Sequence, residues 1–122
     1  MKSRKIKTPR QKLIKDCDTL FSKIIRKRDP VCVYCGKNPS KHCAHVFSRR
    51  YLGTRWDSEN AYGMCGGCHI FQAHVDPIEF HQFIIKRIGK DRYDRLRTIS
   101  QMVKKVDLSL IKLGLTKYWE EL

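Results

Sequence analysis

Two pairs of cysteines constrain the fold of this chain more than any other feature. Cys32-Val-Tyr-Cys35 and Cys65-Gly-Gly-Cys68 are CxxC motifs with 29 residues between them. A two-residue gap lets both thiolates of a pair reach one ion, and zinc takes four such ligands in a tetrahedron. The spacing therefore predicts a structural zinc site with four cysteine ligands. Such a site would join two distant segments and stabilise the folded state directly.

Other features of the sequence favour a metal site over disulfides. The first residues, MKSRKIKTPRQK, lack the apolar stretch of a secretory signal, and no segment approaches the length of a membrane span. We therefore expect a cytoplasmic protein with no membrane contact, in which thiols stay reduced. A redox protein that uses CxxC is an alternative, but the βαβ pattern of that class is missing. Cys17 and Cys43 are expected to be buried, inert thiols.

Charge points to a polyanionic partner. The 122 residues include 26 Lys and Arg against 12 Asp and Glu, for a formal net charge of +14. Such an excess raises the local concentration of polyanions and speeds their association with the protein. Nucleic acid is the first partner to consider, and an anionic membrane surface is the second.

The N-terminal quarter of the chain predicts one helix. Thr8-Pro9-Arg10-Gln11 places an N-cap residue, a proline at the first helical position and a glutamine three residues after the cap, which together form a capping box. Apolar residues then recur at helical spacing until Asp29-Pro30, where the proline restricts the residue before it. We expect a basic tail at residues 1–7 and a helix at residues 8–28.

The middle of the chain predicts a different kind of structure. Residues 31–75 contain both cysteine pairs and lack a long periodic pattern, so we expect an irregular zinc core. Short strands are expected around residues 42–47 and 60–64. With helices on both sides, residues 1–122 are expected to form a single α+β domain.

Helical signals return after the second cysteine pair. Asp76-Pro77-Ile78-Glu79 resembles a second capping box, and the helix that it opens should end at Gly89. Another helix is expected from residue 91 to about 103, and Asp107 can cap a last one. Residues 77–122 are therefore interpreted as C-terminal helices.

Three residues around the cysteine pairs suit hydrolytic chemistry. His45, Asn60 and His69 follow one another through the second half of the predicted zinc core. Phosphodiester hydrolysis needs a base to deprotonate water and a cation to neutralise the leaving oxygen. A histidine suits the first task, a second histidine can hold the cation, and an Asn amide can hold the loop that presents the base.

The pattern CxxC, AH, RWxxxN and CxxCH resembles the zinc-containing branch of the HNH, or ββα-metal, endonucleases. It is most similar to the phage recombination nucleases of the NinG (Rap) family. The flanking stretches FSKIIRKRDPVCVYCG and FIIKRIGKDRYDRLR are also similar in kind, so the resemblance covers the chain from about residue 10.

This resemblance implies a fold and a set of roles. The fold would be α+β, with a small ββα-metal, treble-clef-like zinc centre flanked by N- and C-terminal helices. His45 would be the general base and Asn60 would orient the loop. His69 would bind the catalytic ion, magnesium or manganese, while zinc would be structural only. The substrate would be DNA, with branched or junction DNA preferred, in the cytoplasm of the host cell if the chain is phage-encoded.

One position departs from the family pattern. Many HNH proteins carry Asp or His just before the base, where this chain has Ala44. His42 is the first candidate for the missing ligand, because on a strand it falls on the same side as Ala44. Asp57 is a second candidate. His74 and His81 rank lower, and His81 is interpreted as a surface residue.

Arginines between the base and the asparagine are the expected DNA contacts. Arg49, Arg50 and Arg55 lie in this stretch, and guanidinium groups match phosphate oxygens. Trp56 is expected to pack in the core. Contacts of this kind predict binding that weakens steeply with salt and reads little sequence.

The sequence thus predicts a metal-dependent DNA endonuclease, with two alternatives left open. The first is a non-catalytic zinc module that binds nucleic acid. The second is an HNH nuclease for restriction, homing or DNA packaging. A homodimer is attractive for junction cleavage, and the apolar stripes of the terminal helices could form it or could equally be core.

Overall fold

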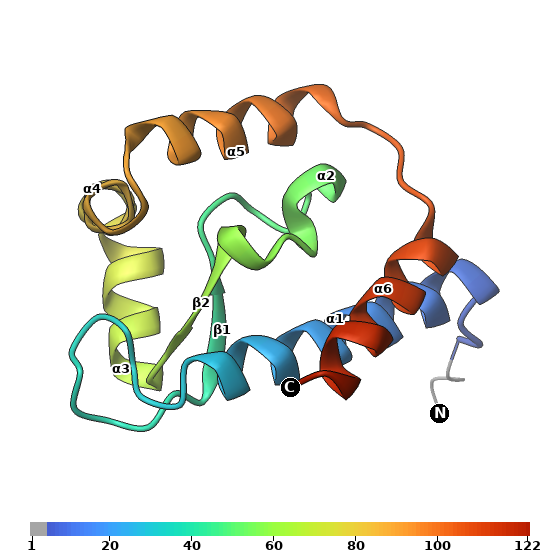
Figure 1. Cartoon of the computed structure of the whole chain (residues 1–122), viewed down its shortest axis with the longest axis horizontal. Coiled ribbons are helices and arrows are strands. Elements are labelled where there is room, and N and C mark those ends of the chain that lie inside the picture. The colour runs from blue at the N-terminus through green and yellow to red at the C-terminus, as the bar shows by residue number, and fades with distance from the viewer. Residues whose placement is uncertain (1–4) are drawn as a thin grey trace.

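The computed structural model describes residues 5–122, and the side chains of residues 72–74 are left out of the description. It is a mixed structure in which helices surround a small two-stranded sheet (Figure 1). The predicted α+β class is confirmed at this level. The helices and strands are α1 (Pro9–Arg28), β1 (His42–His45), α2 (Leu52–Arg55), η1 (Ser58–Asn60), β2 (Ala61–Met64), α3 (Gly66–Cys68), η2 (His69–Val75), α4 (Pro77–Ile88), α5 (Lys90–Met102) and α6 (Leu108–Glu120).

Helix α1 begins as its capping box predicts. The hydroxyl of Thr8 accepts the backbone N–H of Gln11 at 3.1 Å, and the side-chain oxygen of Gln11 accepts the backbone N–H of Thr8 at 2.9 Å. The helix ends at Arg28, just before Asp29-Pro30. Of the tail predicted at residues 1–7, residues 1–4 lie outside the described part of the chain.

Helices α1 and α6 lie side by side, although they come from opposite ends of the sequence (Figure 1). Cys17 is fully buried on α1, as expected, and its thiol lies 3.8 Å from the backbone carbonyl of Leu108. Phe21 and Trp56 join the same apolar cluster, so the prediction that Trp56 packs in the core is confirmed. Much of the apolar stripes considered for a dimer packs together within one chain, through Leu13 and Phe21 of α1 and Leu108, Ile111 and Leu115 of α6.

Strands β1 and β2 pair in antiparallel fashion, with His42 opposite Met64 and His45 opposite Ala61. The strands are shorter than expected and lie within the predicted ranges. Position 63 on β2 needs a glycine because Asp29 packs closely against it: an added Cβ atom there would lie 2.8 Å from the Cβ of Asp29. The N–H of Gly63 instead donates to the Asp29 carboxylate at 2.9 Å, which fixes the end of α1 to the sheet.

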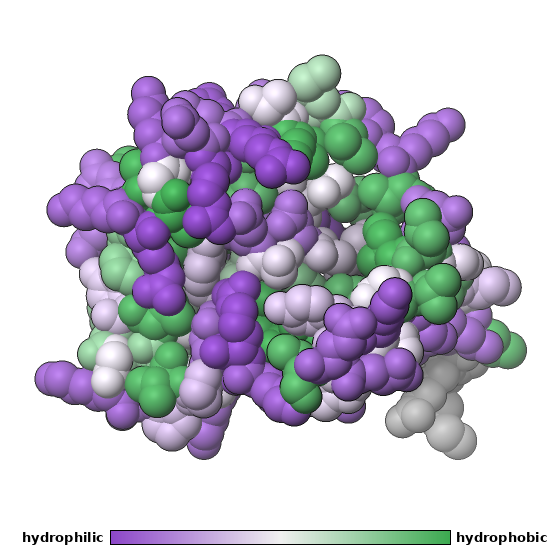
Figure 2. Space-filling model, viewed as in Figure 1, coloured by the Kyte–Doolittle hydropathy of each residue, from purple (hydrophilic) through white to green (hydrophobic). Residues whose placement is uncertain are grey.

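The C-terminal helices follow their sequence signals. Asp76 accepts the N–H of Glu79 at 3.1 Å, and α4 ends at Gly89, whose φ of 90° suits glycine. Asp107 accepts the N–H of Leu110 at 3.1 Å at the start of α6. Figure 2 shows hydrophilic residues over most of the face in view and apolar residues over the connection between α5 and α6.

Local sequence patterns give no signal for two helical segments, although the ββα resemblance implies a helix after the second strand. One is α2, and the other runs through α3 and η2 and carries His69 directly after the last cysteine. In the part of the chain that is described, no helix is long and apolar enough to cross a membrane.

Candidate functional site

The four predicted zinc ligands meet at one point. The Sγ atoms of Cys32, Cys35, Cys65 and Cys68 all lie within 4.8 Å of one another, and those of Cys35 and Cys65 are 4.0 Å apart. Zinc–sulfur bonds of about 2.3 Å in a tetrahedron place sulfurs roughly 3.8 Å apart. The cluster therefore has the ligand chemistry and nearly the spacing that zinc requires, and it could hold a zinc ion.

The first cysteine pair sits in a tight turn whose backbone amides reach the Cys35 sulfur. Gly36 has a φ of 66°, a conformation that favours glycine, and its N–H donates to the carbonyl of Cys32 at 2.9 Å. The backbone amides of Asn38 and Lys37 bond the sulfur of Cys35 and lower its pKa to about 6. The amide group of Asn38 also lies 3.9 Å from the Cys65 sulfur. The backbone donors thus stabilise negative charge on the Cys35 sulfur, which suits a zinc ligand.

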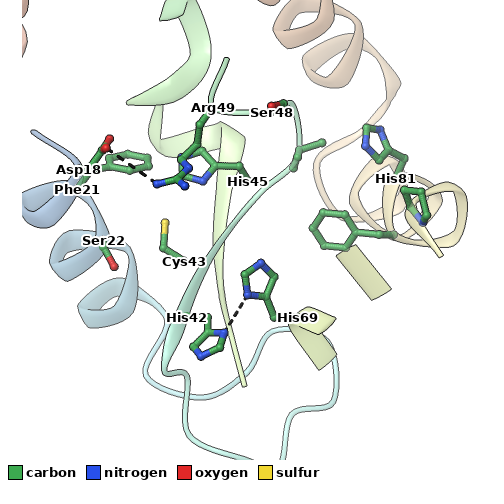
Figure 3. A pocket seen from close by; sticks show the side chains of 13 residues that line it. Asp18, Phe21, Ser22, His42, Cys43, His45, Ser48, Arg49, His69 and His81 are labelled. Atoms are coloured by element: carbon green, nitrogen blue, oxygen red, sulfur yellow. Dashed lines mark hydrogen bonds and ion pairs between the residues drawn. The ribbon is translucent and has the colours of Figure 1, made fainter. Parts of the chain in front are cut away.

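His69, which follows the last cysteine of this cluster directly, lines a cavity of about 720 Å³. Figure 3 shows the side chains around this cavity. Its walls come from α1, from β1 and the loop after it, from His69, and from the start of α4. Three of the residues singled out in the sequence line it together: His42, His45 and His69. They come from the two ends of β1 and from the helical segment after the second cysteine pair.

His42 and His69 face each other across part of the cavity. Their Nδ1 atoms are 2.9 Å apart and their rings are nearly perpendicular, at 82° (Figure 3). Two nitrogens that bind one ion at right angles, each at about 2.1 Å, lie roughly 3.0 Å apart. In this structure one ring donates a hydrogen bond to the other. The same separation fits neighbouring ligands on a metal ion, which would take the place of the shared proton.

His45 is held in one tautomer. Its Nε2 lies 2.9 Å from the backbone carbonyl oxygen of Arg55. A carbonyl only accepts hydrogen bonds, so Nε2 must carry the proton and Nδ1 keeps its lone pair. The ring packs against Phe21 at a centroid distance of 5.6 Å. Burial lowers the pKa of His45, which keeps the imidazole neutral and able to accept a proton near neutral pH.

Asn60 holds the loop that follows β1. Its side chain is fully buried and makes three hydrogen bonds with backbone groups. Its oxygen accepts the N–H of Phe47 at 2.9 Å, and its amide donates to the carbonyls of Phe47 at 3.1 Å and Thr54 at 2.9 Å. The amide thus bonds the backbone on both sides of Arg49 and Arg50, two of the three predicted DNA contacts.

The three predicted DNA-contacting arginines differ in their surroundings. Arg49 is 62% exposed and lines the cavity, and Arg50 is exposed beside the ring of Tyr51. Arg55 instead uses its guanidinium inside the protein, where it bonds Asp18 and the carbonyl of Arg49. Arg50 can therefore meet a phosphate as it stands, and Arg49 would give up only its 4.0 Å ion pair with Asp18. Arg55 would have to give up several close partners.

Two of the lower-ranked residues have roles in the fold. Asp57 caps η1 by accepting the N–H of Glu59 at 2.9 Å, and it lines a different cavity, beside α6, from the one that the histidines line. The interpretation of His81 as a surface residue is wrong. His81 is half-buried and lines the cavity, and its Nδ1 lies 2.6 Å from the hydroxyl of Tyr93 on α5. The side chain of His74 lies outside the described part of the structure.

The remaining cysteine on β1 also lines the cavity. Cys43 is partly exposed there rather than buried, and desolvation raises the pKa of its thiol to about 12. A thiol with this pKa stays protonated at neutral pH, which agrees with the expectation that it is inert.

Comparison of the chain with protein-family models, with curated proteins and with solved structures finds no match.

Proposed function

We propose that this chain is a metal-dependent DNA endonuclease that hydrolyses phosphodiester bonds. The observation that carries the proposal is the shared cavity of His45, His42 and His69, the last of which directly follows the four-cysteine cluster. A base and an ion-binding pair on the walls of one cavity are what phosphodiester hydrolysis requires. The order of β1, β2 and the helical segment at residues 66–75 supports the ββα-metal (HNH) type that the sequence resembles.

In the proposed mechanism, His45 is the general base. The carbonyl of Arg55 holds Nε2–H, so Nδ1 accepts a proton from a water molecule in the cavity as the water oxygen attacks the phosphorus. Asn60 keeps the loop after β1 in place during this step. Arg49, exposed on the same loop, binds a phosphate oxygen and aligns the scissile strand.

His42 and His69 would hold the catalytic ion. When bound there, the ion would neutralise charge on the leaving oxygen. Two imidazoles suit a transition metal better than magnesium, which prefers oxygen ligands. Of the two ions expected for this site, manganese therefore fits the protein donors better. The role of zinc in the cysteine cluster would be structural.

Charge supports DNA as the substrate. The formal net charge is +14, and exposed Arg49 and Arg50 lie on the loop beside the proposed base. Phosphate contacts of this kind would bind DNA with little regard to sequence. The preference for branched DNA rests on the resemblance to phage recombination nucleases and is part of the proposal.

A cleavage panel tests the function. The parent chain, His45→Ala and Cys43→Ser would be incubated with a four-way junction, a flap and a linear duplex, in manganese, in magnesium and without a divalent ion. Cys43→Ser is the matched control, since it changes a cavity residue that has no part in the mechanism. We expect manganese-dependent cutting by the parent and the control, and a loss of at least a hundredfold in His45→Ala.

Each alternative has its own outcome in this panel. DNA binding without cutting under any condition would indicate a non-catalytic zinc module. Cutting that survives His45→Ala would refute the assignment of the base. Equal rates on all three DNA shapes would favour a nuclease for restriction, homing or packaging over a recombination nuclease.

A further inference from the structure

Asp18 has an unusual set of partners for a residue in the middle of a helix. Its carboxylate accepts the Nε–H of Arg55 at 3.0 Å and an Nη2–H of the same side chain at 2.6 Å. It also accepts the indole N–H of Trp56 at 2.9 Å. One carboxylate on α1 thus receives three donors from two consecutive residues that lie about forty positions along the chain.

These bonds end at the residue that holds the proposed base. The backbone carbonyl of Arg55 accepts Nε2–H of His45, so a clamp on the side chains of Arg55 and Trp56 also fixes that carbonyl. A fork-to-fork contact between arginine and carboxylate restricts orientation as well as distance. A continuous series of contacts therefore joins Asp18 on α1, through Arg55 and Trp56, to the imidazole of His45 at the end of β1.

The same carboxylate reaches the loop at a second point. An Nη1 of Arg49 lies 4.0 Å from Asp18, and the carbonyl of Arg49 accepts a hydrogen bond from Arg55 at 3.1 Å. Asp18 itself lines the cavity, and its side chain is only 25% exposed (Figure 3). Both ends of the segment from residue 49 to residue 56 are thus tied to one carboxylate.

We propose that Asp18 is a positioning residue for His45, acting through Arg55 and Trp56. The clamp keeps the Arg55 carbonyl aimed at Nε2–H, which directs Nδ1 to the cavity. This inference rests on the proposed function, because it assigns His45 the role of base. It adds a residue on a helix far from the cysteine and histidine motifs.

The test compares two carboxylates on the same helix. Asp18→Asn removes the charged clamp, whereas Asp16→Asn removes a carboxylate whose partner is the exposed Lys112, at 3.1 Å. The two variants change charge equally, two residues apart. Arg55→Lys is a second test variant, because lysine keeps the charge pair but cannot form the fork.

Two readouts separate positioning from stability. One is kcat against KM for cleavage of DNA in manganese. The other is solvent exchange of the His45 Nε2 proton, measured by NMR on chains labelled with ¹⁵N-histidine, well below the unfolding temperature. We expect Asp18→Asn to lower kcat at least tenfold with KM within twofold of the parent, and to speed the exchange at least tenfold. Arg55→Lys should give a smaller change of the same kind, and Asp16→Asn should match the parent.

Other results would overturn the proposal. If Asp18→Asn lowers the unfolding temperature but leaves kcat and the exchange rate at the parent values, Asp18 serves the fold alone. If the parent does not cleave DNA, the proposed function fails, and the exchange rate still decides whether Asp18 holds the imidazole. Should Asp18→Asn not fold, the same two readouts on Arg55→Lys decide the question.

Discussion

Replacing Asn60 by aspartate exchanges the side-chain NH₂ group for an oxygen, at the residue whose amide holds the loop after β1. The introduced carboxyl can still accept the N–H of Phe47, as the Asn60 oxygen does at 2.9 Å. Its second oxygen, however, takes the place of an amide that donates to the carbonyls of Phe47 and Thr54 at 3.1 and 2.9 Å. An ionised carboxylate there would face two carbonyl oxygens without a proton to share. A protonated carboxyl can satisfy only one of them.

The magnitude follows from these contacts and from complete burial of the side chain. Loss of one hydrogen bond to a buried carbonyl costs about 1 kcal/mol even when the carboxyl is protonated. Burial raises a carboxyl pKa by roughly 3 to 5 units, from about 3.9 in the unfolded chain to about 7 to 9. Because the folded pKa is raised, the native state is penalised increasingly as pH rises from 3.9 toward that value, by about 1.36 kcal/mol per pH unit.

The expected destabilisation is therefore about 4 kcal/mol at pH 6.0 and about 6 kcal/mol at pH 7.5. The assay is urea unfolding followed by far-UV circular dichroism, with the same zinc concentration throughout. The free energy of unfolding of Asn60→Asp is compared with that of the parent at each pH. Gln82→Glu, on an exposed position of α4, is the matched control for the added charge and should lie within about 0.5 kcal/mol of the parent.

A particular result would refute the reasoning. If the destabilisation by Asn60→Asp is under about 1 kcal/mol and the same at both pH values, the amide does not hold the loop by donating to the two carbonyls. A large but pH-independent effect would indicate a packing defect instead of a buried charge.

Three further predictions concern stability and metals. Gly114→Ala should raise the free energy of unfolding by about 0.5 to 1 kcal/mol, because Gly114 lies inside α6 and an added Cβ would meet nothing within 4 Å. A lower melting temperature than that of the parent would contradict this prediction. For the parent we expect about one zinc per chain, and Cys35→Ser should bind much less and melt at a lower temperature, as measured by metal analysis and calorimetry. Parent-like zinc content would exclude Cys35 as a ligand. His42→Ala should raise the manganese concentration needed for half-maximal cleavage about tenfold or more without changing zinc content, and an unchanged manganese requirement would remove His42 from the ion site.

Local signals in the sequence predicted the long helices and the cysteine cluster well. The capping box at Thr8 and the capping aspartates Asp76 and Asp107 specify helix starts through contacts within four residues, and each bond is present in the structure. Gly89 likewise ends α4 through a property of its own backbone. Features of this kind need no knowledge of the tertiary structure.

The helix at residues 66–75 and the wall of the cavity were harder to predict. Gly66 and Gly67 have poor helix propensity, so the helix that presents His69 gives little local signal. His81 looks like a surface residue in α4, and only the packing of α4 beside the loop after β1 brings it to the cavity. The pairing of Asp18 with Arg55 joins elements that no short motif connects.

Contacts between distant residues were also what the sequence could not predict at the candidate site. The residue types and the spacing predicted the candidate side chains, and the structure adds that His42, His45 and His69 share one cavity. The tautomer of His45 depends on a carbonyl ten residues away in the chain, which a motif cannot specify. Strand parity suggested His42, but its 2.9 Å approach to His69 arises from the position of the second cysteine pair.

The pairing of α1 with α6 has a consequence for synthesis of the chain on the ribosome. The apolar face of α1 emerges early, yet part of its cover is α6, and Cys17 meets Leu108 across 91 positions of sequence. At typical elongation rates of 5 to 20 residues per second, that face waits roughly 5 to 18 s for its partner. During this interval the nascent chain would expose the apolar face of α1, which favours aggregation until α6 covers it.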